Sequence, residues 1–300
     1  MTKKIVEIQD IKKEFNQKTV LSNITFSIKK NECIALLGKN GAGKSTLLNI
    51  IIGKYFQNDG NVKIYCEKKN VGFLPQNTNF PDDIKVNELI NFVSSYTDTP
   101  LSEEEVALIL NFSNEQMNKF ASKLSGGQQR LLDFCLAVIN KPQFLIVDEP
   151  TSSMDTSTRH HFWECIQQLK EKGTTVLFTT HYIEEVNYCA DRVLLLDNGN
   201  LMADETPYRL RMLNHEKIIV LDINLYKQFE QPLQHIIICN QIKEIFSKST
   251  VEFYFVAERT DDIIKALLSI GFPIKEVELT NTSLLDTIFE GTHIEETQND

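Results

Sequence analysis

The stretch Cys33-Ile34-Ala35-Leu36-Leu37-Gly38-Lys39-Asn40-Gly41-Ala42-Gly43-Lys44-Ser45 determines the fold of this chain. Its first five residues form a continuous apolar run that ends at a glycine, which predicts a fully buried parallel strand. Residues 44–53 carry apolar side chains at helical spacing and end at another glycine, so they predict a helix. A glycine-rich loop between a buried strand and a helix is the phosphate-loop pattern.

This loop predicts how a nucleoside triphosphate would be held. Glycines allow the loop to curl so that successive backbone N–H groups point inward, and the following helix adds the positive end of its dipole. We expect Lys44 to reach the β- and γ-phosphates and the Ser45 hydroxyl to bind Mg²⁺. The residues predicted to contact ATP here are Gly38, Lys39, Asn40, Gly41, Ala42, Gly43, Lys44, Ser45 and Thr46.

Two carboxylates follow a second buried strand, which we predict over residues 144–147. The carboxyl end of a central strand faces the crevice in which α/β sheets bind ligands. We therefore expect Asp148 to bind Mg²⁺, directly or through water. Glu149 is the candidate to polarise the water that attacks the γ-phosphate.

A second anion-binding element begins at Leu124-Ser125-Gly126-Gly127-Gln128-Gln129-Arg130. A serine and two glycines that open a helix place free backbone N–H groups at its N-terminus. A single nucleotide bound at the phosphate loop does not explain why the chain has a second anion-binding element. Leu-Ser-Gly-Gly-Gln is, however, the signature motif of the ATP-binding subunits of ABC transporters, and over residues 1 to about 210 the chain resembles that family.

The resemblance assigns roles to four further residues. Phe15 takes the position of the aromatic ring that stacks on adenine, and Gln76 that of the glutamine that senses Mg²⁺ and the γ-phosphate. Asp155 takes the position of the D-loop aspartate, which communicates across the dimer. His181 takes the position of the switch histidine, which contacts the γ-phosphate. ATP and Mg²⁺ are the implied cofactors, with Ser45, Gln76 and Asp148 around the metal.

The family resemblance also implies two kinds of protein partner. Two ATPase domains, identical or paralogous, would pair head-to-tail, with Ser125, Gly126, Gly127 and Gln128 of each chain contacting the ATP of the other. Binding would close the dimer and hydrolysis would loosen it. This cycle would drive separate permease subunits, which implies a peripheral location on the cytoplasmic face of the cell membrane.

One loop departs from the family pattern. The usual Thr-Ser-Gly-Leu-Asp is here Thr151-Ser152-Ser153-Met154-Asp155. Serine adds a side chain in a tight loop, whereas methionine nearly conserves the volume of leucine. Because Glu149 is intact, we expect hydrolysis to persist and communication across the dimer to change at most.

Apolar runs that alternate with helical patterns predict an α/β fold with a mostly parallel central sheet. The family adds an N-terminal antiparallel β subdomain, whose first strands we expect at 5–8 and 24–28, and a helical subdomain over about 77–140. The composition changes near residue 214, and from residue 216 onward there are 15 acidic and 7 basic residues. We therefore expect an ABC-type P-loop ATPase domain over 1–215 and a small α+β domain over 216–300.

Composition excludes several other classes. The formal net charge is −10, which disfavours nucleic acid as a partner. No apolar run is long enough to span a membrane, and no apolar region follows the basic N-terminus as in a signal peptide. The six cysteines are scattered without a CxxC pair, so neither a zinc site nor a disulfide framework is expected.

The direction of transport is inferred from the C-terminal segment of the chain. Residues 282–289, Thr-Ser-Leu-Leu-Asp-Thr-Ile-Phe, are similar to the Ser-Leu-Glu-Asp-Val-Phe close of bacterial exporters of drugs, peptide antibiotics and polysaccharides. The apolar side chains of this segment would pack into the core of the C-terminal domain. Export of a peptide, antibiotic, drug or lipid-like compound is the main hypothesis. The alternatives are an import ATPase or an ABC ATPase that acts outside transport; the cargo and the role of the C-terminal domain stay open.

Overall fold

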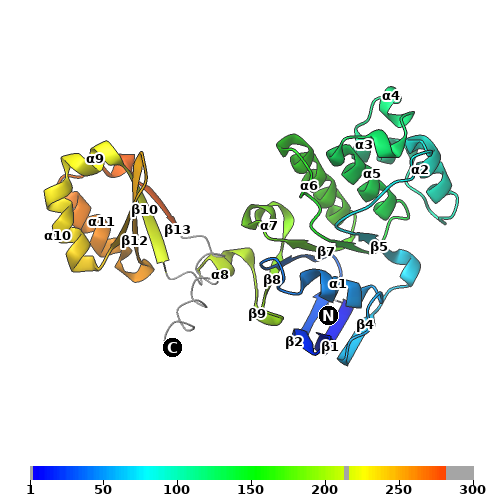
Figure 1. Ribbon diagram of the computed structural model, residues 1–300, viewed down its shortest axis with the longest axis horizontal. Coiled ribbons are helices and arrows are strands. Elements are labelled where there is room, and N and C mark those ends of the chain that lie inside the picture. The colour runs from blue at the N-terminus through cyan, green and yellow to red at the C-terminus, as the bar shows by residue number, and fades with distance from the viewer. Residues whose placement is uncertain (1–2, 213–215, 282–300) are drawn as a thin grey trace. The chain divides into compact units, whose positions relative to one another are not determined.

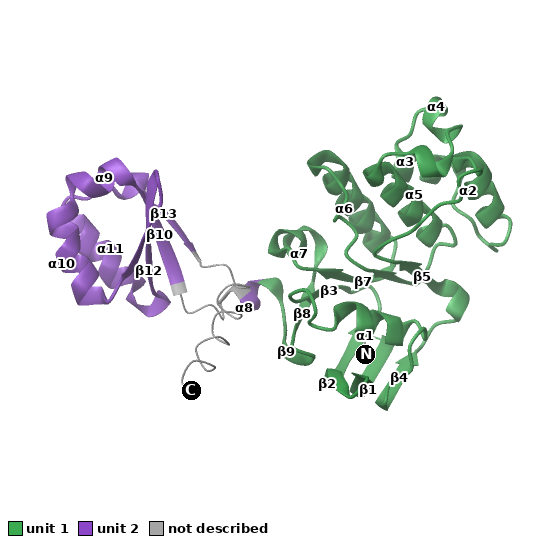
Figure 2. Cartoon of the chain, in the orientation of Figure 1, with its two compact units in different colours: residues 1–207 green, residues 208–300 purple. Residues whose placement is uncertain are grey.

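The computed structural model describes residues 3–212 and 216–281, and the chain divides into two compact units, residues 1–207 and 208–300 (Figure 2). The composition of the sequence predicts the domain boundary later in the chain, at about residue 215. Helix α8 (Pro207–Met212) lies between that predicted boundary and the boundary after residue 207. Within the described ranges, none of the helices has the length and apolar character needed to cross a bilayer.

A six-stranded sheet with the order β5-β6-β7-β3-β8-β9 forms the centre of the first unit. The five strands from β5 to β8 run parallel, and β9 pairs with β8 in the antiparallel sense. Strands β3, β6 and β7 are buried along their whole length, as expected for strands covered on both faces. Their bounds are β3 Cys33–Leu37, β5 Val71–Leu74, β6 Phe144–Val147, β7 Thr175–Thr180, β8 Arg192–Asp197 and β9 Asn200–Glu205.

An antiparallel sheet with the order β2-β1-β4 lies on one side of the central sheet. Helix α1 (Lys44–Ile51) packs between the two sheets, because its apolar side chains share one buried cluster with residues of β1, β2, β3 and β6 (Figure 1). Strand β1 (Lys4–Phe15) and strand β2 (Lys18–Lys29) are longer than the short strands that the sequence predicts, and β4 spans Asp59–Ile64. Register shifts along the β1–β2 pair break the strict alternation by which the sequence indicates a strand.

Helices cover the opposite side of the central sheet and extend into the predicted helical subdomain (Figure 1). Helix α3 begins with a capping box, in which the side chains of Ser102 and Glu105 each accept a hydrogen bond from the other residue's backbone N–H. The helices are α2 Val86–Ser94, α3 Glu103–Leu110, α4 Asn114–Met117, α5 Gly126–Val138, α6 Thr156–Glu171 and α7 Ile183–Cys189.

The second unit has a βαββαβ topology with the strand order β11-β12-β10-β13. All its strand pairs are antiparallel, and α9, α10 and α11 bury their apolar residues against one face of the sheet. The elements are β10 Glu216–Asp222, α9 Ile223–Gln228, α10 Glu230–Asn240, β11 Lys243–Phe246, β12 Thr250–Val256, α11 Thr260–Ser269 and β13 Glu278–Asn281. The exporter-like segment 282–289 lies outside the described residues.

Candidate nucleotide site

The phosphate loop follows β3 directly, and its glycines fill positions where a side chain does not fit. A Cβ atom at Gly38 would lie 2.3 Å from the carbonyl oxygen of Leu196 in β8. Gly43, the residue before α1, has φ +104°, and a Cβ atom there would lie 2.8 Å from a methyl group of Leu21. Gly41 has φ +86° in open space. Close packing therefore requires glycine at two positions and backbone conformation favours it at the third.

Lys44 is buried at the start of α1, and three oxygen atoms surround its ammonium group. Its Nζ donates to the backbone carbonyls of Gly38 at 2.7 Å and Lys39 at 3.1 Å. It also lies 3.2 Å from Oε1 of Glu149. The side chain is thereby folded back over the loop and paired with the carboxylate that follows β6. A triphosphate that enters the loop would compete with Glu149 for this cation.

The carboxylate of Glu149 is contacted by polar side chains for which the sequence predicts a role in hydrolysis. Besides Lys44, its Oε2 accepts a hydrogen bond of 3.0 Å from Nε2 of Gln76, and its Oε1 lies 3.7 Å from Nδ1 of His181. The Nδ1 atom of His181 is buried and makes no hydrogen bond within the described chain. Residues from three separate segments of the chain thus converge on the Glu149 carboxylate.

Asp148 is buried next to this group and is held by a residue that the sequence analysis missed. The Thr179 hydroxyl at the end of β7 donates to Oδ1 of Asp148 at 2.6 Å and accepts from the backbone N–H of Glu149 at 2.8 Å. The two threonines that directly precede His181 were the feature of the sequence that could have indicated this role. The Asp148 carboxylate, the Ser45 hydroxyl and the Gln76 amide supply oxygen ligands, which is the donor chemistry that Mg²⁺ prefers.

A cavity of about 430 Å³ lies over the loop. Most of the phosphate-loop residues that the sequence predicts to contact ATP line this cavity. Val20 of β2 also lines it, although the sequence analysis does not predict a role for this residue. Asp148, His181 and Phe15 are not among its lining residues. The lining consists of Val20, Asn40, Gly41, Gly43, Lys44, Ser45, Thr46, Gln76 and Glu149.

Phe15 is exposed at the end of β1. Its ring makes an edge-to-face contact with Tyr55 at a centroid distance of 5.6 Å, and Nζ of Lys13 lies 4.6 Å from its centroid. At 40% exposure, this ring has apolar surface on which a base can stack.

The predicted signature residues lie at the N-terminus of α5, apart from the cavity. Ser125 caps the helix, and its hydroxyl accepts from the backbone N–H of Gln128. Ser125 and Gly126 are exposed. A Cβ atom at Gly126 would lie 3.6 Å from Cβ of Ser153, so the altered loop packs beside the signature. Asp155 caps α6, and the pKa of its carboxyl is lowered by the backbone N–H of Thr158, which favours the charged form.

Arg130 links the signature helix to the nucleotide site, and the sequence analysis did not identify it. Its buried guanidinium donates to the backbone carbonyls of Asp148 and Pro150, at 2.9 Å each, and to that of Pro75, next to Gln76. Burial lowers the pKa of Arg130 to about 10, so it stays protonated at neutral pH. Its place two residues after the signature motif was the feature of the sequence that could have indicated it.

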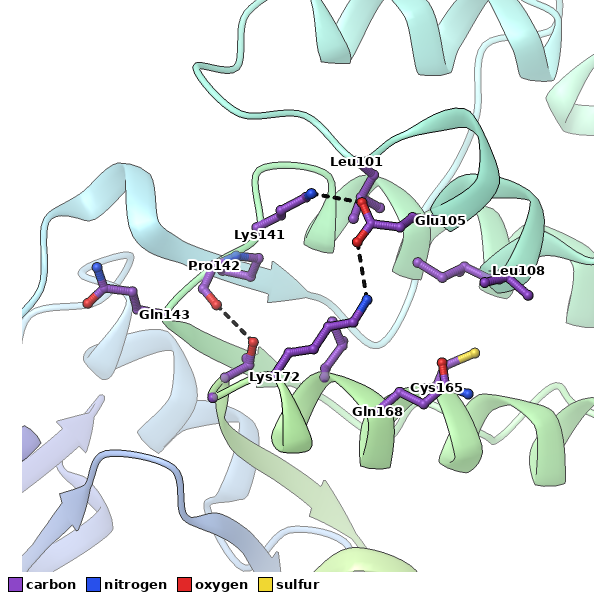
Figure 3. Close-up of a pocket in the computed structure, with 13 residues that line it drawn as sticks. Leu101, Glu105, Leu108, Lys141, Pro142, Gln143, Cys165, Gln168 and Lys172 are labelled. Atoms are coloured by element: carbon purple, nitrogen blue, oxygen red, sulfur yellow. Dashed lines mark hydrogen bonds and ion pairs between the residues drawn. The ribbon is translucent and has the colours of Figure 1, made fainter.

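A second cavity, of about 230 Å³, has Pro142 and Gln143 in its lining, which directly precede β6 (Figure 3). The nucleotide residues Asp148 and Glu149 follow the other end of that strand. In this second cavity Glu105 of α3 pairs with Lys141 at 2.8 Å and Lys172 at 3.1 Å. Chiefly the hydrogen bond from Lys141 lowers the pKa of Glu105 to about 2. None of the predicted site residues lines this cavity, so it is separate from the nucleotide site.

Comparison with known proteins places this geometry in a family. Residues 21–152 match the ABC transporter family. The chain is 32% identical over 223 residues to the Nod factor export ATP-binding protein I of Rhizobium sp. (strain N33), covering 70% of this chain and 73% of the relative. It is 32% identical to the linearmycin resistance ATP-binding protein LnrL of Bacillus subtilis (strain 168), over 66% of this chain and 68% of the relative.

Solved structures show the same fold. The ATP-binding subunit of an ABC transporter superposes with a TM-score of 0.63 at 24% identity, covering 70% of this chain and 92% of the other. The dimeric structure of MJ0796, a bacterial ABC transporter cassette, gives a TM-score of 0.60 at 24% identity, covering 67% and 98%. The expected fold, with its mostly parallel sheet and antiparallel β subdomain, is confirmed.

The chain therefore belongs to the ATP-binding subunits of ABC transporters. It binds ATP and is an ATPase, as the sequence predicts. Both relatives named above are ATP-binding proteins, one named for export and the other for resistance to a compound.

Proposed function

We propose that this ATPase powers the export of a peptide, antibiotic, drug or lipid-like compound through separate permease subunits, from a peripheral position on the cytoplasmic face of the membrane. The convergence of Lys44, Gln76 and His181 on Glu149 beside the phosphate loop carries the ATPase part of the proposal. The relatives' names, Nod factor export and linearmycin resistance, support export of such a compound.

In the proposed reaction, Glu149 accepts a proton from the water that attacks the γ-phosphate. Its carboxylate is nearly buried and is oriented by the Gln76 amide, so its free oxygen surface faces the cavity. Lys44 leaves Glu149 and binds the β- and γ-phosphates when ATP enters, and His181, which lies beside Glu149, contacts the γ-phosphate. Phe15 stacks on the adenine ring.

We infer that Ser45, Gln76 and Asp148 hold the Mg²⁺ that accompanies ATP. The ion would neutralise charge on the phosphate oxygens. Thr179 donates a hydrogen bond to one oxygen of Asp148 and so restrains the orientation of this carboxylate, whose second oxygen would be the metal ligand.

The second subunit of the proposed dimer completes the site. Ser125 and Gly126 are exposed at a helix N-terminus and Gly127 and Gln128 follow them, yet none of the four lines the cavity of its own chain. A head-to-tail arrangement, in which these residues bind the nucleotide of the partner subunit, gives this anion-binding terminus a ligand. The solved MJ0796 cassette is described as dimeric, which supports this arrangement. In this proposal residues 1–215 form the ATPase domain and residues 216–300 the accessory domain.

Affinity purification of the tagged chain from membranes tests the transport assignment. We expect a permease to co-purify, and we expect its reconstitution with this chain to give ATP-dependent movement of an apolar or amphipathic compound out of the compartment that holds the ATPase. A partner with a solute-binding protein would instead assign import. Recovery with ribosomes or nucleic acid, without any membrane protein, would refute the transporter assignment.

A further inference from the structure

Glu185 is a buried carboxylate that the proposed nucleotide chemistry leaves without a role. It lies on α7 and is 2% exposed, whereas the adjacent Glu184 is exposed. A carboxylate stays charged in the interior only when hydrogen bonds replace its hydration. Two threonine hydroxyls supply them, since Thr151 donates to Oε1 and Thr180 donates to Oε2 at 2.6 Å.

The bond to Thr180 fixes the turn that carries His181. The Thr180 hydroxyl donates to Glu185 and also accepts from the backbone N–H of Tyr182 at 2.9 Å. These two hydrogen bonds flank His181 on both sides. The position of the histidine relative to Glu149 therefore depends on a hydroxyl that Glu185 orients.

The hydrogen bond between Glu185 and Thr151 fixes the segment that follows Glu149 in the chain. Thr151 lies two residues after Glu149, and its carbonyl accepts from the backbone N–H of Met154 at 3.1 Å, which closes the turn that leads to Asp155. Asp155 in turn caps α6. One carboxylate thus holds both the His181 turn and the Thr151–Asp155 turn.

Arg159 connects the same carboxylate to α6. Its Nε lies 4.0 Å from Oε1 of Glu185, and its guanidinium lies 5.6 Å from the centre of the Tyr182 ring. The backbone N–H of Arg159 donates to the carbonyl of Asp155 at 2.9 Å. The cation that faces Glu185 therefore lies one helical turn after Asp155, the residue assigned to the dimer contact.

We propose that Glu185 is a positioning residue that couples the His181 turn to the Thr151–Asp155 turn, so that the histidine at the γ-phosphate and the loop at the dimer surface move as one unit. The inference rests on the proposed function, because it needs both the hydrolytic role of His181 and the dimer role of Asp155. Glu185 itself contacts neither the cavity over the phosphate loop nor Lys44, so ATP affinity should not depend on it.

Two variants of different severity test this coupling. Glu185→Gln keeps the shape but turns one accepting oxygen into a donating amide, so one threonine hydroxyl must reorient. Thr180 has little freedom to do so, because it already accepts from Tyr182. Glu185→Ala removes both acceptors and leaves two buried hydroxyls without a partner. Glu184→Gln, which neutralises the exposed neighbour on the same helix, is the matched control.

The full-length chain is assayed for ATP hydrolysis and, without divalent cations, for ATP affinity. We expect kcat to fall about 10-fold in Glu185→Gln and about 100-fold in Glu185→Ala, with the Kd for ATP within about 2-fold of wild type. If Glu185 acts through the loop that ends at Asp155, Glu185→Gln combined with Asp155→Ala should lose no more activity than the more severe single variant. Glu184→Gln should match wild type.

Four outcomes separate the possibilities. A fall in kcat at constant Kd, with non-additive effects, supports the coupling. Unchanged kcat in Glu185→Gln, which keeps the volume of the side chain, overturns it even where Glu185→Ala fails to fold. A weakening of ATP affinity in proportion to the fall in kcat also overturns it, because it indicates a general structural role. A wild-type chain that binds ATP without hydrolysing it overturns the proposed function, and the inference with it.

Discussion

Replacing Glu149 with glutamine should have opposite effects on ATP binding and on ATP hydrolysis. In the structure this carboxylate lies 3.2 Å from the ammonium group of Lys44, the cation that we propose binds the phosphates of the nucleotide. ATP must therefore break a buried ion pair before Lys44 can bind it. Glu149→Gln keeps the shape of the side chain and removes the charge.

The size of the binding effect follows from the geometry of this pair. At 3.2 Å and an effective dielectric constant of about 20, the attraction of two unit charges is about 5 kcal/mol. Desolvation of two nearly buried groups offsets most of that attraction. A net contribution of about 1–2 kcal/mol remains for ATP to displace, so the variant should bind ATP about 5- to 30-fold more tightly. Loss of the proton acceptor should lower kcat by about 10²–10⁴-fold.

Both effects can be measured on the purified full-length chain. ATP affinity is measured by calorimetry without divalent cations, so that neither protein turns over, and hydrolysis by phosphate release with Mg²⁺ present. Size-exclusion chromatography with ATP should show a stable dimer for the variant. Glu164→Gln, at an exposed position of α6, is the control and should change none of these quantities. Equal or weaker ATP binding by Glu149→Gln, or turnover near the wild-type rate, would refute the reasoning.

Three further predictions concern the loop, the signature helix and the second cavity. Gly38→Ala places a Cβ atom 2.3 Å from a backbone oxygen of β8 and should abolish ATP binding and lower the Tm, whereas Gly41→Ala has an open position and should cost about 1–2 kcal/mol for its positive φ. Arg130→Met leaves three backbone carbonyls without their donor and should lower the free energy of unfolding by about 3 kcal/mol in urea titrations. The pKa of Glu105 is lowered in the folded state to about 2, from an ordinary value near 4.5. Its ion pairs therefore stabilise the fold above about pH 4.5, and this contribution is lost as the pH falls toward 2. Glu105→Gln should accordingly be less stable than wild type at neutral pH and equal to it near pH 2.

Each of these has a result that contradicts it. Equal ATP affinity in the Gly38→Ala and Gly41→Ala proteins would show that the close approach to β8 can relax without cost. An Arg130→Met protein as stable as wild type would mean that water replaces the guanidinium. A stability difference between wild type and Glu105→Gln that does not change between pH 7 and pH 2 would mean that the carboxylate charge contributes nothing.

The sequence predicts the buried strands and the glycine loop of the first unit far better than the elements of the second unit. Strands that are buried on both faces, such as β3 and β6, read as uninterrupted apolar runs, and glycine stands where the loop between β3 and α1 needs a positive φ or a close approach. In the second unit, the four-residue strand β11 carries exposed residues, and β10 ends at Asp222, which caps the helix α9 that follows at once. Short, half-exposed elements leave no periodic pattern, because only the partner strand decides their pairing.

Side chains that hydrogen-bond to backbone carbonyls or to other side chains could not be identified from the sequence for a related reason. Arg130 and Thr179 carry no motif of their own, and their importance follows from which strand ends meet at the edge of the sheet. Glu185 reads in sequence as one of two adjacent acidic residues on a short helix. Only the packing of α7 buries one of them between two threonines and leaves the other exposed.

The amino-acid sequence alone determined the fold of the first unit and the family, and it predicts which residues bind the phosphates. It can do so because backbone conformation and burial restrict which residue types occur at consecutive positions. The tertiary structure alone decided that Lys44 pairs with Glu149, that His181 lies beside the same carboxylate, and that the second unit is a βαββαβ sheet. These contacts join residues far apart in the chain, and their geometry is fixed only when the strands have taken their order in the sheet.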